Sequence, residues 1–180
     1  MDTGAEAIVR VPFPNSGPRH LTTASEVATM EFVRSRFGFP VPKVYAWDAS
    51  HDNAVGWEYI IMERCSGENF ASHVDEVAQS AHIIDSLAKL QHDMSETKFS
   101  QFGSIYFKED VDDFLQSRPL YAPGVPYDEC SKRFRIGPSV ERQFYRGERA
   151  GMDLDRGPCK HRLAYVLFLH IPHGRRSVRV

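Results

Sequence analysis

Two charged residues near the start of the chain have the types and the spacing to act together on a charged ligand. Arg10 is the one charge in residues 7–13 (AIVRVPF), whose β-branched residues predict a strand. Glu26 follows in a segment with helical periodicity, on the same side as Met30 and Val33. A guanidinium beside a carboxylate can hold phosphate oxygens or form a plain ion pair, and Glu26 could also serve as a helix cap. The residues alone leave these roles open.

The first 66 residues predict strands around one helix. Thr23 and Glu26 have the spacing of a capping box, so we expect the helix to begin there, and Gly38 and Pro40 end it. Residues 41–47 (VPKVYAW) predict an extended edge segment. Residues 57–64 (WEYIIMER) have the aromatic and β-branched run of a buried strand. The expected order is strand, helix, strand, hairpin, strand.

The second part of the chain is less regular. Residues 71–94 predict a long helix, because Val74, Val77, Ile84 and Leu87 form an apolar stripe along it. Residues 102–107 predict a short strand, and from there to residue 158 we expect irregular structure or a docked insertion. We divide the chain into a small-lobe remnant (1–66), the start of a large lobe with an insertion (67–160) and an atypical basic tail (161–180).

Composition excludes several classes of protein. Of the 180 residues 42% are hydrophobic and 26% charged, which is ordinary for a globular chain, and the formal net charge is −2. We therefore expect neither nucleic acid nor a membrane as partner. Three cysteines without a C-x-x-C pair predict no disulfide framework and no metal site. An intracellular, cytoplasmic location fits, and no basic signal precedes residue 7.

Five phrases in a fixed order carry a resemblance to a known family. They read IVRVPFP (8–14), LTTASEVATMEFVR (21–34), FPVPKVYAWD (39–48), VGWEYIIMERCSGE (55–68) and RFRIGPSVERQFY with LDRGP (133–158). The chain resembles fungal members of the aminoglycoside phosphotransferase family, whose fold is protein-kinase-like. The resemblance implies an α+β fold with a partial small lobe, antiparallel strands plus one helix, followed by the first helix and insertion of the large lobe. Similar fungal proteins include mitochondrial ones, so that location stays open.

The resemblance also implies a reaction, cofactors and site residues. The family transfers a phosphoryl group from ATP, with Mg²⁺, to a hydroxyl of a small-molecule substrate. Arg10 would hold the phosphates where most members place a lysine, and Glu26 would hold Arg10; arginine is not an equivalent replacement at a tight phosphate site. The main chain of Met62, Glu63 and Arg64 looks like the hinge that binds adenine.

Parts of the family's machinery are absent from these 180 residues. No H-x-D follows Leu90, and the last asparagine is Asn69, so no catalytic-loop aspartate or magnesium ligand can be assigned. We expect a truncated member that is inactive alone, with no catalytic and no metal-binding residue. Two alternatives are a non-catalytic binding module with a protein partner on the exposed lobe interface, and an incomplete gene product. The acceptor and the oligomeric state cannot be predicted.

Overall fold

The structure, a computed structural model, describes residues 6–13, 17–67, 77–161 and 166. Within that part the larger elements are β1 (Ala7–Arg10), α1 (Leu21–Phe37), β2 (Val44–Asp48), β3 (Tyr59–Glu63), α2 (Val77–Glu96), β4 (Ser104–Phe107), α3 (Glu129–Arg133) and β5 (Phe134–Gly137). Short 3₁₀ helices are η2 (Lys108–Asp110), η3 (Asp113–Leu115), η4 (Arg142–Phe144) and η5 (Gly147–Gly151). The α+β class predicted from the sequence is confirmed.

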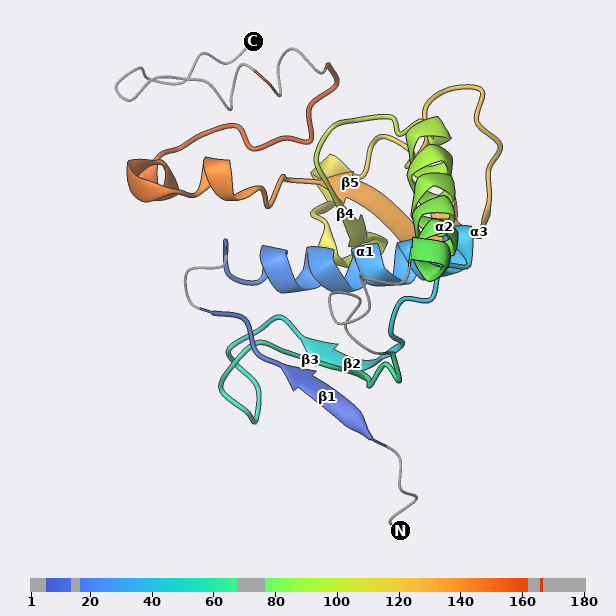
Figure 1. The fold of residues 1–180 in the computed structure, drawn as a ribbon. Coiled ribbons are helices and arrows are strands. Elements are labelled where there is room, and N and C mark those ends of the chain that lie inside the picture. Colours follow the sequence, from blue (N-terminus) through green and yellow to red (C-terminus); the bar gives the residue numbers. More distant parts are fainter. Residues whose placement is uncertain (1–5, 14–16, 68–76, 162–165, 167–180) are drawn as a thin grey trace.

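Two small antiparallel sheets form the layers of the molecule (Figure 1). In the first, β3 is the central strand and the order is β1-β3-β2. Arg10 lies opposite Ile60 in this sheet, and an irregularity between Val44 and Ala46 shifts the β2 register. The second sheet is the β4–β5 hairpin, with Ile105 opposite Ile136. The three strands of the first sheet are those that the sequence predicted.

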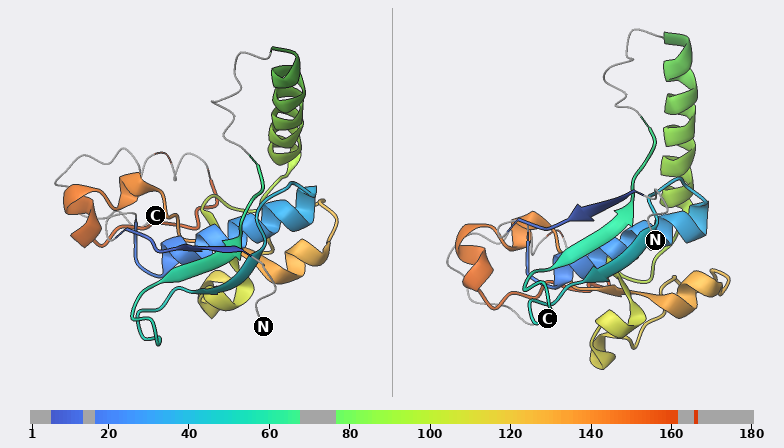
Figure 2. Two further views of the ribbon diagram at one scale, coloured as in Figure 1. Left: turned by 60° about the horizontal axis from the view of Figure 1, so that its bottom comes forward. Right: turned by 90° about the horizontal axis from the view of Figure 1, so that it is seen from below.

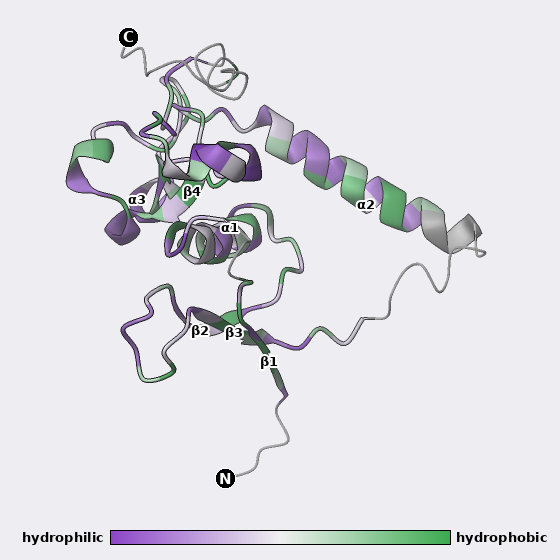
Figure 3. Cartoon of the chain, turned by 90° about the vertical axis from the view of Figure 1, so that its left-hand side faces the viewer, coloured by the Kyte–Doolittle hydropathy of each residue, from purple (hydrophilic) through white to green (hydrophobic). Residues whose placement is uncertain are grey.

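Helix α1 lies between the two sheets, as Figures 1 and 3 show. It packs against β2 and β3 on one side and against β4 and α3 on the other. Its buried residues are Thr23, Ala24, Ser25, Val27, Ala28 and Phe32. A helix covered on two sides buries residues around much of its circumference, so a single apolar stripe does not describe it. The sequence predicted one stripe, and Met30 and Val33 in that stripe are only half-buried.

The predicted capping box is wrong. Helix α1 begins at Leu21, two residues earlier than expected, and its N-cap His20 makes no side-chain capping hydrogen bond. The Thr23 hydroxyl instead donates to Glu58, 35 residues away, and Glu26 pairs with Arg10. Long-range partners therefore replace the local exchange that the spacing suggested. The predicted end is correct, since Gly38 adopts the left-handed conformation (φ 64°) after the last turn.

Residues of the segment after residue 98 pack against α1. A core cluster joins α1 to it through Phe32, Leu120, Tyr121, Phe134 and Ile136. The ring of Phe32 lies edge-on to that of Phe134, with centroids 5.5 Å apart. The short strand predicted at residues 102–107 is observed as β4, whereas β5, with four residues, is too short to show a period in the sequence.

Helix α2 projects away from the rest of the described chain (Figures 2 and 3). The helix predicted from residue 71 is observed from Val77, and the predicted first turns lie outside the described residues. Its apolar residues Ile83, Ile84, Leu87 and Met94 are all exposed, Ile84 to 61%. No helix in the described part of the chain is both long and apolar enough to cross a bilayer.

Candidate functional site

The structure brings Arg10 and Glu26 together. The Nη1 atom of Arg10, at the end of β1, contacts Oε1 of Glu26 on α1. The Arg10 side chain is 52% exposed and that of Glu26 is 25% exposed. An ion pair this exposed contributes at most about 1 kcal/mol to the free energy of unfolding, so it does little to stabilise the fold. Its geometry leaves part of a guanidinium, held in place by a carboxylate, open toward solvent.

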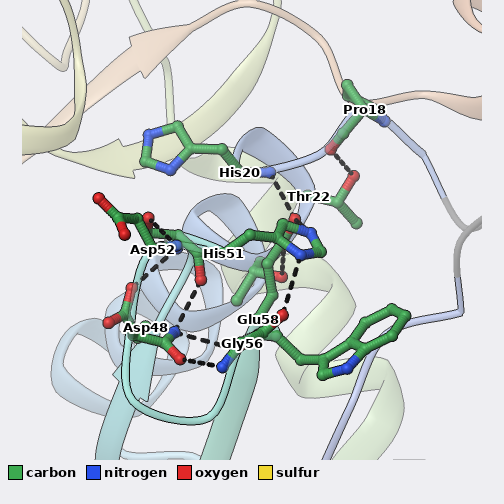
Figure 4. A network of polar contacts seen from close by, with 12 residues as sticks. Pro18, His20, Thr22, Asp48, His51, Asp52, Gly56 and Glu58 are labelled. Carbon is green, nitrogen blue, oxygen red and sulfur yellow. Dashed lines mark hydrogen bonds and ion pairs between the residues drawn. The ribbon is translucent and has the colours of Figure 1, made fainter.

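A second carboxylate, Glu58, fixes the start of α1 (Figure 4). Glu58 is only 4% exposed. It accepts hydrogen bonds from the main-chain N–H of His20 at 2.9 Å and from the Thr23 hydroxyl at 2.6 Å. A negative charge there also complements the positive end of the helix dipole. Glu58 thus ties the residue before β3 to the helix that carries Glu26. Sequence reasoning missed it, because its partners lie 35 and 38 residues away.

The loop between β2 and β3 brings a histidine to the same carboxylate (Figure 4). The His51 Nε2 atom lies 3.5 Å from Oε1 of Glu58, and Nδ1 lies 3.3 Å from the carbonyl oxygen of Gly56. The side-chain oxygen Oδ1 of Asn53 accepts from the N–H groups of Val55 and Gly56 at 2.9 Å and closes the loop. The loop therefore places an imidazole against the Glu58 carboxylate.

The candidate hinge lies at the far end of β3 from Arg10. Met62 and Glu63 pair with β1, and the Glu63 N–H donates to the Lys43 carbonyl at 2.8 Å. Their main chain therefore belongs largely to the sheet. The Arg64 side chain pairs with Glu6, and Arg64 lies beyond the last paired residue of β3. From Ile60, opposite Arg10, to Glu63 the strand rises about 10 Å.

A comparison with protein families decides the classification. The model of the phosphotransferase enzyme family matches residues 1–141, which include both sheets, α1 and α2. This chain belongs to the phosphotransferase enzyme family. The resemblance to aminoglycoside phosphotransferases is thereby confirmed, and with it the partial kinase-like fold.

Curated relatives of this phosphotransferase-family chain come from fungi. A subtelomeric hrmA-associated cluster protein of Aspergillus fumigatus (strain CBS 144.89 / FGSC A1163 / CEA10) is 40% identical over 162 residues, 87% of this chain and 29% of its own length. Altered inheritance of mitochondria protein 9, mitochondrial, is 34% identical in Candida albicans (strain SC5314 / ATCC MYA-2876), covering 82% of this chain and 25% of that protein. The Yarrowia lipolytica protein of that name is 32% identical over 92% of this chain and 31% of its own. The chain spans less than a third of the length of these relatives. No solved structure matches it significantly.

The described residues include a cation that could face a phosphate group but no cluster suited to a magnesium ion. They contain no group of three or more His, Cys, Asp or Glu side chains arranged to hold a metal. Asp153 and Asp155 have a D-x-D spacing, but Asp155 accepts a hydrogen bond from the Gly157 N–H at 2.9 Å and shapes its own loop. For the phosphates, the partly exposed guanidinium of Arg10 offers donors of the right charge.

Proposed function

We propose that this chain is the nucleotide-holding part of a phosphotransferase, with Arg10 gripping ATP phosphates and Glu26 orienting Arg10. The contact between these two side chains, from β1 and α1, is the observation that supports the proposal. The substrate class that follows from the family is a small molecule with a hydroxyl group. ATP, when bound, would supply the phosphoryl group.

Each residue of the site has a distinct task in this proposal. Arg10 provides charged donors that can face two phosphate oxygens. Glu26 holds one side of the guanidinium, which lowers the entropy that Arg10 loses when a phosphate binds. Glu58 acts one step further away, because it fixes the first turn of α1 and thereby the position of Glu26. The main chain beyond Glu63 is not paired with a neighbouring strand, so in this proposal its N–H and C=O groups are the part of the hinge that binds adenine.

The same proposal assigns no turnover to these 180 residues by themselves. Phosphoryl transfer in kinase-like proteins requires an aspartate that orients the acceptor hydroxyl, together with an asparagine and a second aspartate for magnesium. The chain has no asparagine after Asn69 and no H-x-D after Leu90. It would therefore bind ATP without transferring a phosphoryl group.

Calorimetric titration of the purified chain with ATP tests the proposal. Arg10→Ala should weaken ATP binding about tenfold or more, because a charge-assisted hydrogen bond contributes about 1.5–3 kcal/mol. Glu26→Gln should weaken it less, since Arg10 remains but loses its orientation. Glu31→Gln is the matched control: Glu31 lies on the same helix and pairs with Arg133 at 3.1 Å, at similar exposure. It should leave the ATP dissociation constant unchanged.

Two results would contradict the proposal. If Arg10→Ala and Glu26→Gln bind ATP as the parent chain does, the pair has no role at a nucleotide site. If the purified chain phosphorylates an acceptor above the buffer background, and Glu26→Gln abolishes this, the assignment of binding without turnover is wrong.

A non-catalytic binding module is the second candidate function, and the exposed stripe of α2 favours it. Ile83, Ile84, Leu87 and Met94 leave a run of apolar surface uncovered. We propose that it is covered by a polypeptide corresponding to the part of the curated relatives that this chain does not match. That part is more than two thirds of each relative.

A further inference from the structure

A pocket lined by arginines lies beside the start of α1. Its volume is about 510 Å³, and it lies between the turn at Gly17 and Pro18 and the segment that carries η4 and η5. Figures 1 and 2 show that segment, in orange, next to the first turn of α1. Three of its lining residues are Arg142, Arg146 and Arg156. No carboxylate is among the lining residues in the described part of the chain.

Contacts with neighbouring residues fix the position of the Arg156 side chain in the wall of the pocket. Its guanidinium stacks on the ring of Tyr145, 4.7 Å from the centroid, and Nη2 donates to the carbonyl oxygens of Arg149 at 2.9 Å and Met152 at 3.1 Å. The Nε atom is buried and has no acceptor within the described residues. These contacts position the guanidinium but involve no carboxylate, so they leave its positive charge uncompensated.

Arg142 and Arg146 add two exposed charges to the same pocket. Among the described residues neither forms an ion pair. The acidic residues of the same segment, Glu141, Glu148, Asp153 and Asp155, do not line the pocket. Three arginines that line one pocket, with no carboxylate among the described lining residues, make the pocket electropositive, which favours a bound anion.

We propose that this pocket binds the phosphate monoester group of a small molecule. Arginine matches the geometry of phosphate oxygens with paired donors, and three arginines suit a group that carries two charges near neutral pH. A volume of about 510 Å³ also leaves room for an organic part beside the phosphate. Tyr145 and Pro18 supply less polar walls for it. Arg10 and Glu26 do not line this pocket, so the inference does not depend on the proposed nucleotide site.

Calorimetric titration of the 180-residue chain with phenyl phosphate is the test. Arg142→Ala and Arg146→Ala should each raise the dissociation constant about tenfold. Both side chains are exposed, so the variants should fold, and thermal unfolding checks that they do. Arg118→Ala removes the same charge outside the pocket and should change the dissociation constant less than about twofold. Glu26→Gln should leave phenyl phosphate binding unaltered, which separates this site from the nucleotide site.

A second arm distinguishes a soluble ligand from a lipid headgroup. The chain is sedimented with phosphatidylcholine vesicles with and without phosphatidic acid, whose headgroup is also a phosphate monoester. If Arg142→Ala and Arg146→Ala lose binding to either probe, the proposal is supported. Loss with phenyl phosphate indicates a soluble phosphate monoester as ligand, and loss with phosphatidic acid vesicles indicates a lipid headgroup. If neither probe binds, or if Arg118→Ala weakens binding as much as the pocket variants do, the proposal is overturned.

Discussion

Glu26 and Glu58 act on the same helix at different depths. Glu26 contacts one guanidinium at the surface, whereas Glu58 is buried and accepts from two donors on the first turn of α1. A buried carboxylate with satisfied hydrogen bonds contributes more to stability than an exposed ion pair, because removing it strands its donors away from water. We therefore assign Glu58 a structural role and Glu26 a role toward the ligand.

Glu58→Gln tests that assignment. The amide keeps the shape of the side chain but has one oxygen for two donors, so the free energy of unfolding should fall by about 1–3 kcal/mol. Urea denaturation measures the change. Glu129→Gln, which removes an exposed charge paired with Lys132, should stay within about 0.5 kcal/mol of the parent chain. Equal effects of the two substitutions would show that the Glu58 network does not hold α1.

Among the elements, the β4–β5 hairpin packs tightly enough to depend on a glycine. A side-chain carbon at Gly137 would come within 2.7 Å of the Tyr106 ring. That ring is fully buried and its hydroxyl donates to the Pro138 carbonyl at 2.8 Å. Burial raises the pKa of the Tyr106 hydroxyl, so it stays a donor over the ordinary pH range. The ring therefore has little freedom to move aside.

Gly137→Ala should lower the free energy of unfolding by about 1–3 kcal/mol, the usual cost of overpacking a core. Gly151→Ala is the matched control, because a side-chain carbon at Gly151 meets nothing within 4 Å. Thermal unfolding of the two variants gives the comparison. A Gly137→Ala chain as stable as the control would mean that the hairpin can shift on α1.

At the scale of the whole molecule, the uncovered stripe of α2 has measurable consequences. The chain alone should bind an apolar dye such as anilinonaphthalene sulfonate, and Leu87→Glu should reduce the fluorescence because it breaks the stripe. Lys89→Glu, on the same helix outside the stripe, is the control. The polypeptide corresponding to the unmatched part of the Aspergillus fumigatus relative should co-elute with the parent chain and not with Leu87→Glu. If neither Leu87→Glu nor Lys89→Glu changes the dye fluorescence, the dye binds an apolar surface other than the stripe of α2.

Sequence reasoning found the local features and missed those that depend on distant parts of the chain. The strands around Arg10 and Ile60 and the end of α1 at Gly38 follow from residue types and spacing. The contact between Arg10 and Glu26 was expected from the resemblance to kinase-like phosphotransferases, since the residues alone left their roles open. Glu58 could not be found, since only the folded chain brings it to His20 and Thr23.

The arginine pocket was missed for a similar reason. Arg142 and Arg156 belong to two separate phrases, RFRIGPSVERQFY and LDRGP, and Arg146 lies outside both, so only the folded chain brings the three arginines to one pocket. The hinge assignment of residues 62–64 and the domain boundaries stay predictions. Across the boundary drawn at residue 66, α1 packs directly on β4.

The three thiols differ sharply in accessibility. Cys130 and Cys159 are buried, and burial raises the pKa of both thiols, that of Cys159 to about 11. Cys65 is exposed and lies two residues past the end of β3. The native chain therefore carries one natural attachment point for a maleimide dye, next to the candidate adenine site. A fluorophore placed there could report the arrival of a ligand without any change to the sequence.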